Sequence, residues 1–163
     1  MKIDVQDLVQ EKVLKKDIDL ELKKDILFDG SENIKFLDTI KLKGSVSKMG
    51  NLLHLEAKIN TNVELSCSRC LSKFPYKIDL NIVEEFSNCK KCEDEDVISI
   101  ECDEIDIAEV IMNNIIMALP IKRLCKENCK GLCQQCGTNL NYSKCNCKDD
   151  DVDPRLAQLK DFF

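Results

Sequence analysis

The chain has 163 residues, including eleven cysteines and a single histidine, and its formal net charge is −6. This acidic balance argues against a generic nucleic-acid binder, whose affinity comes mostly from neutralising phosphates. With one histidine, no nucleophile-elbow motif and no phosphate-binding glycine loop, nothing in the sequence supports a hydrolase. We therefore expect a protein that is not an enzyme and has no small-molecule substrate.

The length predicts one domain with a tail, namely an α+β core over residues 1–120 and a cysteine-rich tail over residues 121–163. The first five residues, Met-Lys-Ile-Asp-Val, have no apolar run of the kind that a signal peptide or membrane span needs. We expect a cytoplasmic protein that has no membrane partner. Because the cytosol is reducing, its cysteines should be free thiols or metal ligands.

Apolar and polar residues alternate along several segments of the first half of the chain, with the period expected of half-buried β-strands. The alternation is clear at residues 18–22, 53–59 and 74–82, and a C-x-x-C pair at 67–70 falls in the bend between the last two. This pattern predicts a strongly twisted antiparallel sheet. His54 lies on the polar face of its strand, and we expect it to face solvent rather than to bind a metal.

In the core, one helix is expected, over residues 106–119. Asp106 has the form of an acidic N-cap, Glu109 follows three positions later, and Pro120 ends the pattern. Apolar residues cover most of the remaining helix surface, so the helix should be largely buried against the sheet. It should also deliver the chain to Cys125 and place the tail against the C-x-x-C bend. The expected fold is therefore α+β, with a twisted antiparallel β-sheet core, one buried helix and a zinc-binding tail.

Two further segments carry weaker signals. Cys89 and Cys92 form another C-x-x-C in a charged stretch that lacks the glycine of a metal knuckle. This indicates a loop with incidental or weakly metal-binding thiols, and Cys102 resembles an isolated small hydrophobe. Residues 154–163 begin with proline and carry one apolar face, which predicts a short helix that either caps the core or docks on a partner.

The tail contains the strongest motif of the chain, Cys133-Gln-Gln-Cys136-Gly137. Two thiols one tight turn apart point at the same centre, and the glycine permits the left-handed backbone that the turn needs. Cys145 and Cys147 follow after eight residues, which is long enough for the chain to reverse and complete a tetrahedron. We expect a structural Zn²⁺ site here. A disulfide cluster is the alternative, and the lack of an export signal argues against it.

Four more cysteines form two pairs, Cys67 with Cys70 and Cys125 with Cys129. Neither pair completes a tetrahedral site alone, so a second zinc ion bound by all four would tie the middle of the chain to the tail. A competing partition places Cys125 or Cys129 in the tail's own cluster and leaves Cys67 and Cys70 as a reduced or redox-active pair. The sequence does not choose between these partitions, nor between one zinc ion and two.

Charge is unevenly distributed along the chain. Residues 93–109 carry nine acids and no base, whereas residues 120–148 carry six bases and one acid, Glu127. The bases either balance the negative charge of metal-bound thiolates or face the phosphates of an RNA. The candidate contacts to RNA or to a partner protein are Arg69, Lys122, Arg123, Lys126, Lys130 and Lys144.

A set of short motifs extends from about residue 40 to the end of the chain. They are Cys67-Ser-Arg-Cys-Leu71 with Phe74, residues 104–107 and 117–120, and in the tail residues 129–133, 136–137, 139–141, 145–147 and 153–156. As a set these motifs resemble the bacterial YceD family, in the version with a cysteine-rich C-terminus. The family is named for large-subunit ribosomal RNA accumulation. The resemblance implies a small protein acting in the synthesis, processing or stability of that RNA, with no catalytic residue to carry over.

Three functions follow from these features. The first is a non-enzymatic ribosome-biogenesis factor whose zinc-stabilised tail faces large-subunit ribosomal RNA or a ribosomal protein. The second is an adaptor whose acidic segment, residues 93–109, binds a basic ribosomal or RNA-processing protein. The third is a thiol redox protein, which is disfavoured because redox dithiols usually open a helix and the pair at 67–70 is expected between strands. Salt separates the first two, because RNA binding should weaken steeply as salt rises.

Overall fold

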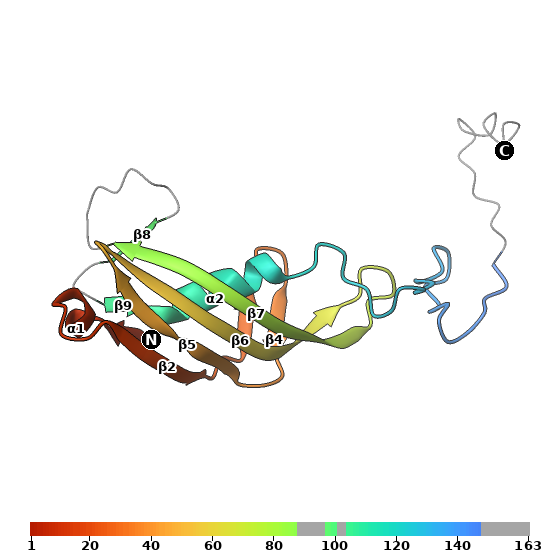
Figure 1. The fold of residues 1–163 in the computed structure, drawn as a ribbon. Coiled ribbons are helices and arrows are strands. Elements are labelled where there is room, and N and C mark those ends of the chain that lie inside the picture. The colour runs from red at the N-terminus through yellow and green to blue at the C-terminus, as the bar shows by residue number, and fades with distance from the viewer. Residues whose placement is uncertain (88–96, 101–103, 148–163) are drawn as a thin grey trace, which may run out of the picture.

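The computed structural model describes residues 1–87, 97–100 and 104–147. Strands dominate these residues, and two helices accompany them (Figure 1). The strands are β1 (Lys2–Asp4), β2 (Lys15–Leu22), β3 (Ile26–Phe28), β4 (Asn33–Phe36), β5 (Ile40–Met49), β6 (Leu52–Ser66), β7 (Lys73–Ser87), β8 (Val97–Ser99) and β9 (Glu104–Asp106). The helices are α1 (Gln6–Val9) and α2 (Ile107–Ala118).

Seven strands form one sheet, which confirms the predicted antiparallel core. Strand β6 pairs with β7 along one edge, and with β5 and then β4 along the other. β2 pairs with β5, and β3 pairs with β4, all antiparallel. The pairing of β7 with β8 is parallel, and β1 and β9 form a separate antiparallel pair.

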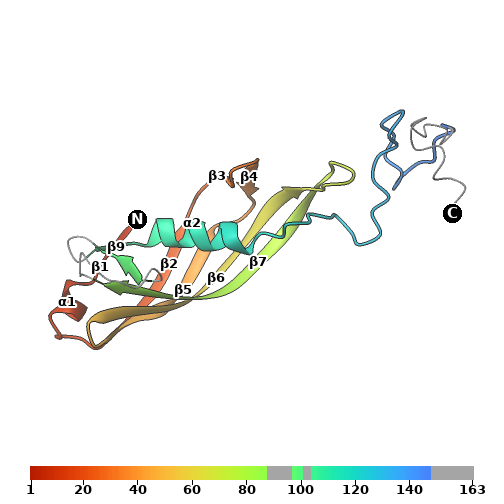
Figure 2. The same ribbon diagram turned by 90° about the horizontal axis from the view of Figure 1, so that it is seen from above.

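The hairpin of β6 and β7 is the longest element of the sheet, and it carries the C-x-x-C pair at its tip. Its register runs from Leu52 opposite Ser87 to Ser66 opposite Lys73. Alternate side chains of β6 are buried, from Leu53 through Leu65, because the period of two places them all on the core face. This length carries the tip well beyond the helix-covered part of the sheet (Figures 1 and 2).

A glycine allows two of these strands to approach closely. Gly44 of β5 lies opposite Ala57 of β6. A Cβ atom at Gly44 would lie 2.2 Å from the carbonyl oxygen of Glu56 and 2.5 Å from Cα of Ala57. Such contacts do not occur in folded proteins, so this position admits only glycine in the present backbone.

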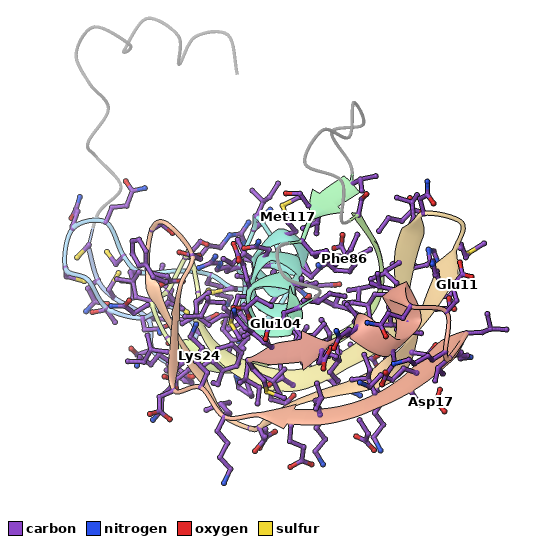
Figure 3. All side chains as sticks on the ribbon, turned by 90° about the vertical axis from the view of Figure 1, so that its left-hand side faces the viewer. Glu11, Asp17, Lys24, Phe86, Glu104 and Met117 are labelled. Carbon is purple, nitrogen blue, oxygen red and sulfur yellow. The ribbon has the colours of Figure 1, made fainter. Side chains whose placement is uncertain are left out.

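Helix α2 covers one face of the sheet, which curves around it (Figure 3). The Asp106 carboxylate accepts a hydrogen bond from the backbone N–H of Ala108 at 3.1 Å, which confirms the predicted N-cap. Ile107, Val110, Ile111, Met112 and Ile115 are buried. Met117 is 86% exposed, so the last turn of the helix also has a solvent-facing side.

The expectation of one helix in the core is wrong, because residues 6–9 form the short helix α1 in addition to α2. The Asp4 carboxylate accepts from the backbone N–H of Gln6 at 2.8 Å and starts this turn. A four-residue helix is too short to show helical periodicity, and the sequence therefore gives no clear pattern there. In the part of the chain that the structure describes, neither helix has the length and apolar character needed to cross a membrane.

His54 lies on the predicted polar face of β6, although its side chain is half-buried rather than open to solvent. Its Nε2 atom lies 3.2 Å from a carboxylate oxygen of Glu56, and its Nδ1 atom lies 3.5 Å from one of Glu85. Other predictions concern residues outside the described ranges: the loop with Cys89 and Cys92, the isolated Cys102, and the helix over residues 154–163.

Candidate metal centres

The first cysteine cluster begins at the tip of the β6–β7 hairpin. Cys67 and Cys70 lie in the connecting turn, where the backbone N–H of Leu71 donates to the carbonyl of Cys67 at 2.9 Å. The N–H of Cys67 donates to the carbonyl of Ser72 at 3.0 Å and closes the turn. Leu71 has a φ of 59°, the left-handed conformation that a tight cysteine turn requires. Both thiols therefore point to the same side.

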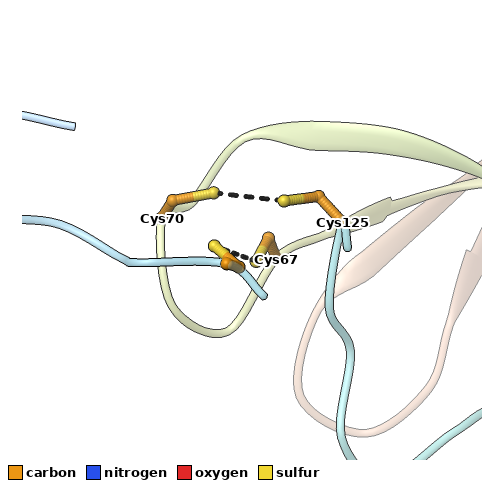
Figure 4. Close-up of side chains that lie close together, drawn as sticks. Cys67, Cys70 and Cys125 are labelled. Carbon is orange, nitrogen blue, oxygen red and sulfur yellow. Dashed lines mark hydrogen bonds between the residues drawn. The ribbon is translucent and has the colours of Figure 1, made fainter. Parts of the chain in front are cut away.

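The tail supplies the other half of this cluster. The Sγ atoms of Cys67 and Cys129 lie 3.8 Å apart, and those of Cys70 and Cys125 lie 3.6 Å apart (Figure 4). All four Sγ atoms lie within 4.8 Å of one another. Cys67, Cys70 and Cys129 are 0%, 5% and 3% exposed and Cys125 is half-buried, so three of the four thiols are closed to water.

Backbone contacts hold the tail against the hairpin tip. The N–H of Ser68 donates to the carbonyl of Arg123 at 2.8 Å, and the N–H of Leu132 donates to the carbonyl of Arg69 at 3.2 Å. The Arg69 guanidinium also donates to the carbonyl of Cys129 at 2.8 Å. Gly131 has a φ of 75°, and a Cβ atom there would lie 3.1 Å from the carbonyl oxygen of Arg69. The cluster therefore joins two segments that are already docked.

Arg123 fixes the chain just before Cys125. Its guanidinium forms ion pairs with the carboxylates of Asp29 and Glu32, in the turn between β3 and β4. Burial opposes ionisation of Asp29, but the Arg123 guanidinium and the N–H groups of Glu32 and Ser31 hold its pKa well below the usual range. The sequence marks residues 29–31 only as a turn, and it carries no signal for this pairing.

Cys133, Cys136, Cys145 and Cys147 form the second cluster, and their Sγ atoms also lie within 4.8 Å of one another. The N–H of Gly137 donates to the carbonyl of Cys133 at 2.9 Å, and Gly137 has a φ of 72°, as the knuckle motif predicts. Cys136 is exposed and the other three are half-buried. This cluster is built from one local segment and is open to solvent.

The thiols of the first cluster cannot all ionise by themselves. Burial tends to raise the pKa of Cys67, but the N–H groups of Cys125, Cys70 and Arg69 outweigh it and lower that pKa to about 6. Burial, and then the thiols of Cys70 and Cys129, raise the pKa of Cys125 to about 12. A cation at the centre would relieve the repulsion among thiolates, because it favours the charged form of every ligand.

The second cluster also contains one thiol with a lowered pKa and one with a raised pKa. The hydroxyl and N–H of Thr138 lower the pKa of Cys136 to about 6. The neighbouring Cys136, followed by burial and Cys133, raises the pKa of Cys147 to about 12. Both clusters are thus four-thiol sites that could hold a metal ion, and the described cysteines form no disulfides with one another.

The structure brings together the two sets of four cysteines of the first predicted partition. The competing partition, with Cys67 and Cys70 apart from the tail, is not the arrangement found. Nothing in the sequence indicated that Asn141 contacts the first cluster, because asparagine at this position indicates only a turn. Its side chain accepts from the N–H of Lys130 at 3.0 Å, and its amide nitrogen lies 3.3 Å from Sγ of Cys129.

Residues 55–163 match the family described as "Large ribosomal RNA subunit accumulation protein YceD". This chain belongs to the YceD family. The match confirms the resemblance seen in the sequence, and it spans helix α2 and every cysteine of the two clusters. No solved structure matches the chain.

Curated relatives of this YceD chain occur in bacteria and plants. An uncharacterized protein of Mycobacterium tuberculosis is 33% identical over 98 residues, which are 57% of this chain and 47% of the relative. The Arabidopsis thaliana protein named "Large ribosomal RNA subunit accumulation protein YCED homolog 1, chloroplastic" is 27% identical over 151 residues, 74% of this chain and 47% of the relative. The Zea mays protein of the same name is 44% identical over 61 residues, 37% of this chain and 20% of the relative. This chain spans about half the length of the first two.

The predicted partner contacts of the YceD chain divide into two groups. Both arginines are engaged within the chain, because Arg69 donates to Cys129 and Arg123 pairs with Asp29. The four lysines are exposed and make no ion pair with any residue of the described ranges. These lysines are Lys122, Lys126, Lys130 and Lys144.

Proposed function

We propose that this chain is a non-enzymatic ribosome-biogenesis factor that supports the synthesis, processing or stability of large-subunit ribosomal RNA. The observation that carries the proposal is the family match over residues 55–163, together with the plant relatives named for accumulation of that RNA. Residues 1–120 act as the folded core, and residues 121–163 act as the tail that meets the partner.

Zinc is the metal that fits both clusters best. Zn²⁺ prefers tetrahedral thiolate sites with Zn–S distances of about 2.3 Å, and such a tetrahedron has S–S edges of about 3.8 Å. The Sγ separations of 3.8 and 3.6 Å in the first cluster support this assignment. Four thiolates leave no open position for a water molecule, so zinc would stabilise the fold rather than activate a nucleophile.

The partner surface consists of the exposed lysines of the tail, Lys122, Lys126, Lys130 and Lys144. Exposed bases bind phosphates and release counterions, which makes affinity depend strongly on salt. We leave Arg123 out of this surface, because its guanidinium is paired with Asp29 and Glu32. Arg69 keeps an exposed side chain, but one guanidinium nitrogen is committed to the carbonyl of Cys129.

One observation supports the adaptor as a second candidate. A hollow of about 540 Å³ between β7, β9 and α2 is lined by four acids, namely Glu84, Glu104, Asp106 and Glu109. Phe86 and Val110 add apolar lining. A basic protein segment would find complementary charge there. Lys2 and the amino terminus already pair with Glu104 and Asp106, which reduces the charge left for a partner.

The test is depletion of the protein in its native cell, with large-subunit and small-subunit ribosomal RNA quantified on the same gel. We expect the ratio of large to small to fall, and wild-type protein to restore it. A variant with all four tail lysines changed to alanine should fail to restore the ratio if the tail meets RNA. A Glu84→Gln/Glu109→Gln variant should fail if the adaptor function holds. An unchanged ratio after depletion would overturn the proposal.

A further inference from the structure

We propose that Tyr142 is a stacking platform for an unpaired RNA base, and that Lys130 and Lys144 bind the phosphates beside it. The proposal rests on the proposed function, because it names the form of RNA that the tail recognises. It assigns a binding role to a tyrosine that lies between Cys136 and Cys145 in the sequence. The ligand is single-stranded RNA, since paired bases are not open to a side chain.

The turn that carries Tyr142 is held by hydrogen bonds on both sides. The N–H groups of Tyr142 and Ser143 donate to the carbonyl of Asn139 at 3.1 and 3.2 Å. The Asn139 side chain accepts from the N–H of Asn141 at 3.0 Å. The N–H of Leu140 donates to the carbonyl of Gly131 at 3.0 Å. This network fixes the backbone under the tyrosine, so little conformational entropy is lost when the ring binds a ligand.

The tyrosine ring itself lies in solvent. Tyr142 is 84% exposed, whereas Tyr76, the other tyrosine of the chain, is half-buried against the core. An isolated exposed aromatic residue is common in proteins and is not a site by itself. Here the turn that carries the ring is held by hydrogen bonds, exposed Lys144 follows it, and exposed Lys130 is bonded to it through the Asn141 side chain. Interleaved aromatic and basic side chains are the pattern that binds single-stranded nucleic acid.

Two lysines lie beside this turn. Lys144 is two residues after the tyrosine, and the N–H of Lys130 is bonded to the Asn141 side chain at 3.0 Å. Lys130, Lys144 and Ser143 line one hollow of about 850 Å³ over the second cluster. Both lysines are exposed, and neither forms an ion pair within the described chain. We assign the phosphates next to a base stacked on Tyr142 to these two lysines, because both belong to or are bonded to the turn that carries the ring.

Binding would be measured by fluorescence anisotropy on the full zinc-loaded chain, with a labelled twelve-nucleotide single-stranded RNA. We expect Tyr142→Ala to raise Kd by about 5- to 150-fold, the range found when one base–aromatic stack is removed. Tyr142→Phe keeps the ring and should bind within about twofold of wild type. The same RNA annealed to its complement should bind more weakly than the single strand and should not respond to Tyr142→Ala.

The lysines are tested by the salt dependence. Lys130→Ala/Lys144→Ala should reduce the slope of log K against log salt by about 0.7 for each phosphate that the variant no longer neutralises. Lys12→Ala/Lys15→Ala removes two exposed lysines near the start of β2 and serves as the control for net charge. If the two tail lysines only balance thiolate charge, removing them will weaken zinc retention and leave the salt slope unchanged. That result would overturn their proposed role.

An RNA that lacks its bases isolates the stacking step. Abasic RNA should bind wild type and Tyr142→Ala equally, because the stack is absent in both complexes. If wild type binds no RNA in any of these forms, the RNA-facing function itself fails. If wild type binds single-stranded RNA and Tyr142→Ala binds it equally well, only the stacking proposal is overturned. Circular dichroism and zinc content of each variant show that the fold is retained.

Discussion

Arg123 and Asp29 form an ion pair across 94 positions of the sequence. The Asp29 side chain is 4% exposed and the Arg123 side chain 16%, so water screens this interaction little. The carbonyl oxygen of Arg123 also accepts a hydrogen bond from the N–H of Ser68 in the hairpin tip. One residue thus joins the β3–β4 turn, the C-x-x-C turn and the start of the tail, two positions before Cys125.

Removal of the Asp29 carboxylate should destabilise the protein. Asp29→Asn leaves the half-buried Arg123 guanidinium with only the half-exposed Glu32, and we expect the free energy of unfolding to fall by about 2 kcal/mol. Glu32→Gln removes the more exposed partner of Arg123 and should lower the free energy of unfolding by less than about 1 kcal/mol. Urea unfolding of both zinc-loaded variants gives the comparison. Equal effects would mean that burial does not distinguish the two carboxylates.

Acid should lower the free energy of unfolding of the wild-type protein more than that of the Asp29→Asn variant. The folded pKa of Asp29 is lowered, so its contribution is present above the ordinary aspartate pKa of about 3.9. The contribution is lost as pH falls from there through the lowered folded pKa. Acid also protonates metal-binding thiols, but it does so in both proteins. The difference in stability between them, followed from pH 6 to pH 2.5 in metal-free buffer, should therefore shrink below about pH 4.

Loss of a cysteine ligand should lower the thermal stability of the core in the first cluster but not in the second. Cys70→Ser removes a ligand from the buried site that joins hairpin to tail, and the midpoint of thermal unfolding should fall by about 10 °C or more. Cys136→Ser alters the local, solvent-exposed site and should leave the midpoint of the core nearly unchanged. Each variant should bind one zinc ion by elemental analysis, against two for wild type. A core midpoint that falls equally in both variants would contradict this division.

Asn141 should control how long the first cluster keeps its metal. Asn141→Ala removes the amide nitrogen 3.3 Å from Sγ of Cys129 and the acceptor for the N–H of Lys130. We expect zinc release to a chromogenic chelator to become several-fold faster, because hydrogen bonds to a thiolate stabilise its charged form. Asn146→Ala is the matched control, since Asn146 is exposed between two cysteines of the second cluster. Similar release from both variants would argue against the role of Asn141.

Gly44 should not tolerate alanine. The added methyl group would meet the backbone of Glu56 and Ala57 at 2.2 to 2.5 Å, so the strands must move apart. We expect Gly44→Ala to cost about 2 kcal/mol or more, within the range for overpacked positions. Ser45→Ala, one residue further along β5, should change stability by less than about 0.5 kcal/mol. Chemical denaturation of the two variants measures the contrast, and a neutral Gly44→Ala would show that the sheet can relax there.

The sequence by itself determined the features that have a short-range signature. Alternation over 53–59 and 74–82 predicted the long hairpin, and the acidic cap at Asp106 predicted a helix that the structure places at Ile107–Ala118. The Cys133 knuckle was visible because its two thiols and its glycine lie within one turn. The four-residue α1 was missed, because so short a helix has no period to detect.

Only the tertiary structure decided how distant segments meet. The partition of Cys67 and Cys70 with Cys125 and Cys129 depends on where the hairpin tip and the end of α2 lie in space. The same holds for Arg123, which the sequence offered as a partner contact and the structure pairs with Asp29. Local pattern records which face of an element is apolar. The packing of these elements against one another depends on burial and on charge pairs between residues far apart in the chain. Such long-range contacts produce no local pattern in the sequence.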